Sequence, residues 1–492
     1  MKRSCGILMP ISALPSDYGI GTLGKAAYDF VDFLVEAKQS WWQMLPVGPT
    51  SYGDSPYQSF STYAGNPYFV DLELLCEDGL LQKEELRLSW GEDPERVDYA
   101  AIYAHRFDVL KKAYLRGKAR DGEKVKAFLK ENEQWLPDYA LFMAVKRYFQ
   151  MRPWMEWPDA GIRLHEREAV EKYGQLLKDE VEFFIYIQYL FFDQWEKLRS
   201  YAKKKGVGII GDLPIYVAMD SADVWSDPKS FQLDEKNVPI EVAGVPPDYF
   251  CEEGQLWGNP LYRWDRMKQD GYGWWIRRIA GASKLYDVLR IDHFRGLESY
   301  WAVPYGEETA KNGHWVKGPG MDLVGVLTGW FSNVQFIAED LGFMTPEVEQ
   351  LLQDSGLPGM KVLEFAFSTS ELSGYLPHCY DKNCVCYAGT HDNTTILGWK
   401  DEAEPEEIAF ATRYLGLNEE EGFVWGMLRG GMSSVADLFI AQMQDVLELG
   451  AQARMNTPSA LGGNWQWRLL KDQITPALTE KLSIMARMYG RS

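Results

Sequence analysis

The chain has 492 residues, of which 46 % are hydrophobic and 25 % are charged, so it holds enough apolar material for a large core. Its formal net charge of −20 argues against nucleic acid, an anionic membrane surface or a polyanionic substrate as a partner, because such partners are bound mainly through Lys and Arg. Six cysteines in this length do not form a disulfide framework.

The amino-terminal residues and the cysteines favour a cytoplasmic protein. Residues 1–12 carry two basic residues and a short apolar run, without a long hydrophobic region or a small-residue cleavage site, so no signal peptide is predicted. No apolar run reaches the roughly 18 residues of a membrane span. Cys384 and Cys386 stand in an apolar run without zinc-ligand spacing, which indicates a buried strand with reduced thiols.

Short apolar runs that end in Gly, Pro or a polar residue are typical of buried parallel strands. Eight such runs follow one another along the chain, at 6–10, 41–47, 207–215, 287–292, 334–340, 360–367, 384–392 and 451–456. Helical patterns separate most of them, at 26–38, 139–151, 183–206 and 345–356. The last of these opens with Thr345 as N-cap and Pro346 as the first helical residue. Alternating strands and helices of this number predict an α/β fold, a (β/α)₈ barrel.

Two long segments interrupt the alternation, and we interpret both as insertions in one catalytic barrel that spans residues 1–492. Residues 50–205, between the second and third strands, contain several amphipathic patterns and are predicted to be mainly helical. Residues 216–272, between the third and fourth strands, are rich in Pro, Gly and aromatic residues. We expect this second, loop-rich insertion to cover the active site.

Aromatic residues make up 14 % of the chain. Core packing accounts for most of them. Others stand beside Gly, Pro and Asp in stretches with the composition of loops, such as 51–60 and 246–260. Loop aromatics suit a ligand with flat faces rich in C–H groups, and sugars have such faces.

Three carboxylates stand at the ends of predicted strands. Asp292 ends the fourth strand, Glu339 ends the fifth, and Asp392 ends the seventh. In (β/α)₈ enzymes the active site lies at the carboxyl ends of the strands, so the three acids are predicted to converge there. A single acid in such a place is usually a helix N-cap or a loop charge, but three together favour catalysis.

The neighbours of these acids suggest how they work. Arg290 and Asp292 are two residues apart on a strand, so their side chains point the same way. The guanidinium is expected to lower the pKa of the Asp292 carboxyl and keep it ionised. His391 precedes Asp392 and can donate a hydrogen bond to a substrate, although a structural histidine is the commoner case.

Glycosyl transfer uses such a set of acids. One carboxylate attacks the anomeric carbon, and a second, held protonated, protonates the leaving oxygen and later deprotonates the acceptor. At this point RIDHFRG (290–296), IAEDLG (337–342) and GTHDN (389–393) resemble the signature segments of the 4-α-glucanotransferases, the amylomaltase or disproportionating-enzyme family related to α-amylases. Five further segments match in order along nearly the whole chain, at 18–24, 53–68, 211–217, 244–262 and 454–458.

The resemblance implies a hexosyl-transferring enzyme that disproportionates maltooligosaccharides without a cofactor, using α-1,4-glucans as donors and glucose or glucans as acceptors. It makes Asp292 the nucleophile, Glu339 the acid/base and Asp392 the transition-state stabiliser. It further implies substrate-binding roles for Arg290, His391, Asp212, Tyr57, Asp248, Phe250, Trp257 and Asn456. Ser459, after Asn456-Thr457-Pro458, departs from the glycine usual in the family.

Several alternatives stay open on the residues alone. A metal site could be built from Asp292, His293, His391 and Asp392 and would make the protein a metal-dependent hydrolase. A catalytically silent carbohydrate-binding barrel would keep the loop aromatics but has no reason to keep all three acids. The glycines at 19, 21 and 24 fit a dinucleotide fingerprint, but no strand directly precedes them and no acid follows at the required distance. Glycoside hydrolysis shares the chemistry of transfer up to the glycosyl-enzyme.

Overall fold

Eight parallel strands form a nearly closed barrel at the centre of the molecule. The computed structural model describes residues 2–247, 252–342, 344–368, 373–460 and 462–492. The strand order is β10-β11-β12-β1-β2-β3-β6-β9, and every neighbouring pair is parallel. The strands are β1 Ser4–Leu8, β2 Trp41–Gln43, β3 Gly208–Leu213, β6 Val288–Ile291, β9 Gln335–Ala338, β10 Gly359–Val362, β11 Cys384–Tyr387 and β12 Leu438–Gln442. This architecture confirms the predicted fold class.

Seven of the eight strands overlap the predicted runs, and the eighth prediction is wrong. Residues 451–456 contain a short 3₁₀ helix, Ala451–Ala453, and an irregular segment. The last barrel strand is instead β12, which pairs with β1 and β11. β12 escaped prediction because the helix α17, Met443–Val446, follows it without an intervening Gly or Pro. The continuous run therefore lacks the punctuation that separates a strand from a helix.

Residues with known helix-end preferences mark some of the helix ends around the barrel. Helix α1 covers Lys25–Glu36, and α8 covers Lys178–Lys205. Gly206 ends α8 with a φ of 82°, a left-handed conformation that glycine adopts without a steric cost. Helix α13, Pro346–Ser355, begins after Thr345 with proline in its first turn, as predicted.

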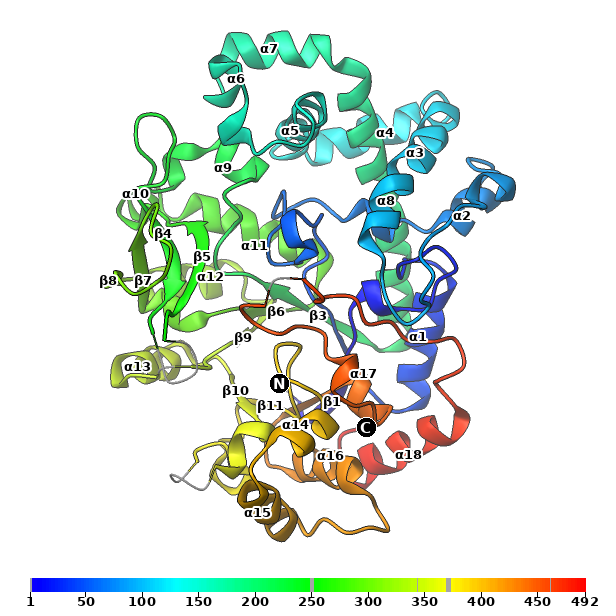
Figure 1. Ribbon diagram of the computed structural model, residues 1–492, viewed down its shortest axis with the longest axis vertical. Coiled ribbons are helices and arrows are strands. Elements are labelled where there is room, and N and C mark those ends of the chain that lie inside the picture. The colour runs from blue at the N-terminus through cyan, green and yellow to red at the C-terminus, as the bar shows by residue number, and fades with distance from the viewer. Residues whose placement is uncertain (1, 248–251, 343, 369–372, 461) are drawn as a thin grey trace.

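A helical region stands at one end of the elongated molecule, beyond the barrel (Figure 1). Between β2 and β3 the chain forms α2 Leu72–Glu77, α3 Tyr99–Gly117, α4 Gly122–Glu131, α5 Leu136–Tyr148, α6 Ala160–Arg163 and α7 Arg167–Leu176 before it enters α8. Helix α8 contacts both α5 in this region and α1 beside the barrel. The long α8 therefore joins the two parts of the structure.

A second, antiparallel sheet flanks the barrel (Figure 1), with the strand order β5-β4-β7-β8. Its strands are β4 Glu241–Val245, β5 Gln255–Pro260, β7 Ser299–Pro304 and β8 His314–Lys317. β4 and β5 lie within the segment 216–272, which is therefore more ordered than its Pro- and Gly-rich composition suggests. β7 and β8 follow β6, so this sheet joins two successive βα segments of the barrel.

Most large aromatic side chains are in the core. Trp42, Trp195, Trp275 and Trp425 are among the tryptophans with less than 2 % of their surface exposed. Cys384 and Cys386 lie buried on β11, as predicted, and the five cysteines that the structure describes are free thiols. Among the described residues, no helix is both long and apolar enough to cross a lipid bilayer.

Candidate active site

The register of neighbouring strands brings Asp292 and Glu339 together. Asp292 directly follows β6, and Glu339 directly follows β9, the next strand of the barrel. The Asp292 backbone N–H donates to the Leu213 carbonyl at 3.0 Å, and the Glu339 N–H donates to the Ile291 carbonyl at 3.0 Å. The strand ladder thus continues past the ends of both strands and aligns the two acids side by side at the carboxyl end of the barrel.

Arg290 connects Asp292 to Asp212. The Arg290 Nη1 lies 2.7 Å from both carboxylate oxygens of Asp212 and 3.1 Å from Asp292 Oδ1. This contact confirms that Arg290 and Asp292 point the same way from β6. Asp212 on β3 is paired with Arg290 on β6, so the strand pairing itself places the carboxylate beside the guanidinium. Although burial alone would lower it, the carboxylates of Asp212 and Asp292 raise the pKa of Arg290.

The expected low pKa of Asp292 is wrong. Burial raises the pKa of the Asp292 carboxyl well above its ordinary value, the positive charge of Arg290 opposes this rise, and the carboxylates of Asp212, Glu339 and Asp392 add to it. Burial is the main reason, and Arg290 does not offset it, since both oxygens of Asp212 contact the same guanidinium nitrogen at a shorter distance. Four acids around one guanidinium favour retention of a proton within the set.

Two backbone groups hold the Glu339 carboxylate. The His293 N–H donates to Glu339 Oε2 at 2.6 Å, and the Leu341 N–H donates to Oε1 at 2.8 Å. Burial raises the pKa of Glu339, while Arg290 and these two N–H groups lower it in part. The donor to Oε2 belongs to the residue after Asp292, which places the Glu339 carboxylate directly beside the predicted nucleophile.

Asp392 reaches the site from a turn rather than from a strand end. Its Oδ1 accepts a hydrogen bond from Asn456 Nδ2 at 2.7 Å, and its backbone carbonyl accepts one from Arg454 Nη2 at 2.7 Å. The turn is also bonded internally, because Asn393 Oδ1 accepts from the Thr390 N–H and hydroxyl. Asn456 thus contacts Asp392, and its role in binding substrate stays a prediction.

Tyr57 bridges the two sides of the site. Its hydroxyl donates to Asp212 Oδ2 at 2.7 Å and lies 2.8 Å from His391 Nε2. Since the single hydroxyl proton is directed at Asp212, we assign the second proton to His391 Nε2, which then donates to Tyr57. Burial lowers the pKa of His391, so the ring is a neutral donor. The two rings stack with their centroids 5.3 Å apart.

The remaining predicted residues divide into two groups. Trp257 lies on β5 with its ring edge-on to His293, at a centroid distance of 4.9 Å. It therefore stands next to the residue that follows Asp292. Asp248 and Phe250 lie outside the described residues. Ser459 has a φ of 64°, a left-handed conformation that favours glycine, which gives a physical reason for the family's glycine at this position.

Sequence reasoning missed several residues of the site. Trp465 is buried and contacts both Tyr57 and His391 with its ring, at centroid distances of 5.8 and 6.0 Å. Arg454 holds the Asp392 turn, and Met360 contacts Arg290. Arg454 lies in the RMNTP segment and could have been singled out there. Trp465 and Met360 carry no local signal, because their roles arise from contacts between distant segments.

No group of three or more His, Cys, Asp or Glu side chains among the described residues is arranged to hold a metal ion. Asp292 and Asp392 are occupied instead by Arg290 and Asn456, and His391 by Tyr57. Burial lowers the pKa of His293 to about 3. These contacts favour a carboxylate site over the metal alternative.

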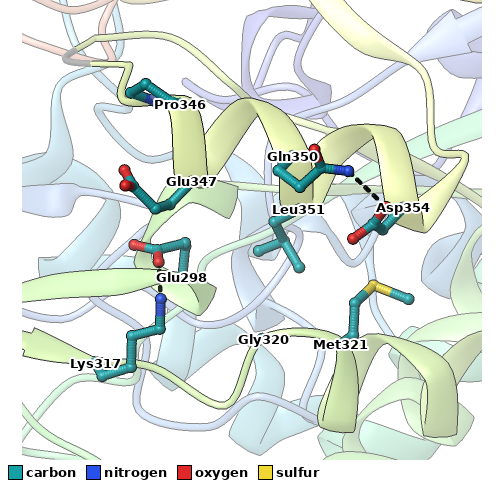
Figure 2. A pocket seen from close by; sticks show the side chains of 9 residues that line it. All are labelled: Glu298, Lys317, Gly320, Met321, Pro346, Glu347, Gln350, Leu351 and Asp354. Atoms are coloured by element: carbon teal, nitrogen blue, oxygen red, sulfur yellow. Dashed lines mark hydrogen bonds and ion pairs between the residues drawn. The ribbon is translucent and has the colours of Figure 1, made fainter.

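An open cleft of about 460 Å³ lies outside this cluster. It is formed by the end of β8, the start of α12, Met321–Trp330, and one face of α13. Figure 2 shows an ion pair between Glu298 and Lys317 on one side of it and a hydrogen bond from Gln350 to Asp354 on the other. Of the predicted site residues that the structure describes, none lines the cleft, so it is not the candidate active site.

A (β/α)₈ barrel that gathers three carboxylates at the carboxyl ends of its strands has the architecture of an enzyme that acts on glycosidic bonds. Comparison with known proteins narrows this class. Residues 9–473 match the family model described as 4-alpha-glucanotransferase. The chain is 49 % identical over 486 residues to a 4-alpha-glucanotransferase of Clostridium butyricum, covering 98 % of this chain and 100 % of the relative. It is 47 % identical to that of Thermus thermophilus, covering 100 % and 99 %.

A solved structure agrees with these sequence matches. The amylomaltase from Streptococcus agalactiae, determined in complex with acarbose, superposes with a TM-score of 0.97 at 43 % identity, and the alignment covers 100 % of both chains. The chain therefore belongs to the 4-alpha-glucanotransferase family, a group of hexosyl-transferring enzymes. The family suggested by the sequence motifs is thus confirmed.

Proposed function

We propose that this enzyme transfers a segment of an α-1,4-glucan to the 4-hydroxyl of glucose or of another glucan by a retaining double displacement. Asp292 acts as the nucleophile, Glu339 as the acid/base and Asp392 as the stabiliser of the transition state. The observation that carries this assignment is the hydrogen bond from the His293 N–H to Glu339 Oε2 at 2.6 Å. This contact supports the assignment, because it sets the Glu339 carboxylate against the residue that follows Asp292, and Asp292 itself contacts Arg290.

In the first step, an Asp292 oxygen attacks the anomeric carbon of the donor, and the bond from that carbon to the leaving glucan oxygen breaks. The leaving oxygen takes the proton of Glu339. In the second step, Glu339 takes the proton of the acceptor 4-hydroxyl, whose oxygen attacks the anomeric carbon and releases the Asp292 carboxylate. Two inversions at one carbon give net retention, and the proton returns to its starting place.

The first step requires one proton on Glu339 and none on Asp292. Burial raises the pKa of both carboxyls, and the positive charge of Arg290, 3.1 Å from Asp292, opposes that rise and supports an anion there. The buried position of Glu339 raises its pKa, as an acid that must hold a proton near neutral pH requires.

The other site residues position the donor sugar and the acids. Asp212 orients Arg290, while His391 and Asn456 hold Asp392 beside the sugar, and Arg290 and His391 face the donor. Tyr57 and Trp257 line the glucan groove. We place Asp248 and Phe250 there also, on the resemblance alone.

Transfer requires that a sugar hydroxyl reach the glycosyl-enzyme before water does. We assign this selectivity to residues 216–272, which lie over the acceptor side and exclude water there. The contact of Trp257 with His293 supports this placement. The catalytic unit then comprises the whole chain, with residues 50–205 as its helical insertion.

The partners and the location follow from composition. We propose that the enzyme works in the cytoplasm on glucans and maltooligosaccharides, with glucose as an acceptor and without binding nucleic acid or membranes. The net charge of −20 and the five free thiols support this view.

Incubation with maltotriose as the single substrate tests the proposal. We expect glucose and longer maltooligosaccharides to form together, with the total number of reducing ends unchanged. A steady rise in reducing ends would show hydrolysis and refute transfer. Loss of activity on treatment with a chelator, with recovery on addition of a divalent ion, would favour the metal-dependent alternative instead.

A further inference from the structure

The barrel closes between β9 and β10, the two strands at the ends of the strand order. Two hydrogen bonds cross this seam at the catalytic end. The Ala338 N–H donates to the Pro358 carbonyl at 2.9 Å, and the Met360 N–H donates to Asp340 Oδ1 at 2.6 Å. A side-chain carboxylate therefore takes the place that a backbone carbonyl holds in an ordinary strand ladder.

The Asp340 carboxylate fits closely against the β10 backbone. Asp340 is 7 % exposed, and a Cβ atom at Gly359 would lie 2.6 Å from its Oδ2. A residue with a side chain at 359 would therefore push the carboxylate away from the Met360 N–H. Gly359 is required here by close approach and not by its φ angle.

The Met360 side chain connects the seam to Arg290, the residue that contacts Asp292. Its side chain is fully buried, and its Sδ accepts a hydrogen bond from Arg290 Nε at 3.3 Å. The Nη1 of the same guanidinium contacts Asp212 and Asp292. Met360 thus restrains the Nε side of the Arg290 guanidinium, whereas the carboxylates contact Nη1, although sulfur is a weak acceptor.

We propose that Asp340 and Met360 are positioning residues for the transfer reaction, and that together with Gly359 they form a seam clasp that fixes Glu339 and Arg290 relative to each other. This inference rests on the proposed roles of Asp292 and Glu339. Asp340 follows Glu339 in the chain, and Met360 touches the arginine that holds Asp292. The contact between Asp340 and Met360 therefore links the residue after Glu339 to the arginine that contacts Asp292.

Loss of the clasp is expected to slow catalysis because the reaction tolerates little displacement of its reacting groups. A displacement of about 1 Å at a reacting group can cost roughly 100-fold in rate. Removal of the Asp340 carboxylate leaves the buried Met360 N–H without its acceptor, and the seam then relaxes at the residue next to Glu339. The Asp340 carboxylate is directed at the Met360 N–H and packs against Gly359, and it is not among the residues proposed to bind the glucan, so we expect the loss to fall on kcat and not on KM.

Three variants and a control test the clasp, with initial rates of maltotriose disproportionation as the readout. We expect Asp340→Ala to lower kcat by roughly 10- to 100-fold with KM changed less than about threefold. Asp340→Asn keeps the Oδ1 acceptor and is expected to stay within about fivefold of the wild type. Asp223→Ala is the control, since Asp223 is buried and also accepts a backbone N–H bond, from Thr62 at 2.9 Å. Its kcat is expected to stay within about twofold, although Tm falls.

Met360→Leu tests the second contact and conserves volume, so it folds even if Asp340→Ala does not. We expect kcat to fall about threefold. The acidic limb of kcat/KM moves to higher pH, because a loosened Arg290 stabilises the Asp292 anion less. The charged groups that face Asp292 are Arg290, Asp212, Glu339 and Asp392, and the variant leaves all of them in place.

The double variant of Asp340→Ala with Met360→Leu decides whether the two residues act as one unit. A single clasp predicts that the double variant is no slower than Asp340→Ala alone, whereas independent residues give effects that multiply. Multiplying effects, an Asp340→Asn variant as slow as Asp340→Ala, or an equal kcat loss in Asp223→Ala would each overturn the proposal. Failure of the proposed function is recognised separately, by retained activity in Asp292→Asn.

Discussion

The three proposed catalytic acids reach the site by two different routes. Asp292 and Glu339 are the first residues after β6 and β9, and backbone hydrogen bonds continue the ladder through both of them. Asp392 is instead the fifth residue after β11 ends at Tyr387. It is held by side chains from a loop more than 60 residues away in the sequence, Arg454 and Asn456.

The difference teaches which parts of the site depend on the fold and which on individual side chains. The register of the barrel brings Asp292 and Glu339, the proposed nucleophile and acid/base, side by side, and the seam clasp then fixes their relative position. The stabiliser depends on a few hydrogen bonds between loops. Substitutions around Asp392 should therefore reduce activity in steps, while the strand-end pair should fail only when the acids or the seam are changed.

The largest effect is expected for Asp292→Asn. The amide keeps the volume of the side chain but is not a nucleophile, so kcat for maltotriose should fall at least about 10⁴-fold. The thermal unfolding curve should show a folded protein with Tm close to the wild-type value. Residual activity within about tenfold of the wild type would remove Asp292 from the mechanism.

The next effect is on the free energy of unfolding, which is expected to depend on pH through Asp445, a residue that contacts the segment after Asp392. Asp445 is 1 % exposed, and its Oδ1 accepts from the Ile396 N–H at 2.7 Å, at the end of the turn that carries Asp392. Burial raises the pKa of Asp445 to about 7. The pKa is about 3.9 in the unfolded chain, so the stability present below pH 4 is lost as pH rises toward 7, to a total of about 4 kcal/mol.

Asp445→Asn should abolish most of that loss, because an amide does not ionise and still accepts from the Ile396 N–H. The measurement is the free energy of unfolding of both proteins in urea at several values between pH 4 and pH 8. The gap between them should widen in favour of the variant as pH rises to 7. Parallel curves would mean that Asp445 ionises in the folded protein as readily as in the unfolded one.

A smaller effect is expected for Asn456→Ala, which removes the amide donor from Asp392 Oδ1. A hydrogen bond to a charged group of this kind is worth enough to lower kcat about 30-fold. Asn383→Ala is a matched control, because Asn383 also donates from its amide, to the Gly356 carbonyl on the exposed surface. Equal rates for the two variants would contradict the view that side chains from the last loop position the stabiliser.

The smallest effect is expected for Tyr57→Phe, which removes the hydroxyl that contacts both Asp212 on β3 and His391 in the Asp392 turn. The ring that stacks on His391 remains, and both former partners keep another bond, Asp212 with Arg290 and His391 with Asp392. We expect kcat/KM for maltotriose to fall about fivefold. A loss as large as that of Asp292→Asn would show that the hydroxyl takes part in the chemistry itself.

The positions of Asp292 and Glu339 at strand ends could be predicted from the sequence, whereas the loop contacts that hold Asp392 could be predicted only in part. Apolar runs followed by an acid locate Asp292 and Glu339, and the spacing of two residues places Arg290 beside Asp292. The raised pKa of Asp292 could not be predicted, since it depends first on the burial of the carboxyl and then on the acids that the paired strands gather around it. Both become visible only in the folded barrel.

The errors have the same origin. The run 451–456 has the composition of a strand, but two of its residues, Arg454 and Asn456, instead hold the Asp392 turn. Trp465 and Met360 belong to the site through contacts with residues more than 60 positions away. No local periodicity encodes a contact of that kind. The family motifs helped at Asn456 because they carry information from the whole fold.

Direct detection of a covalent intermediate on Asp292 tests the central claim. Glu339→Gln should react with α-glucosyl fluoride, whose leaving group needs no acid, and then release the sugar slowly because no base activates the acceptor. We expect mass spectrometry of the digested protein to find one hexosyl group, on the peptide that contains Asp292. A hexosyl group on another residue, or turnover of the fluoride with an unmodified Asp292 throughout, would contradict the account.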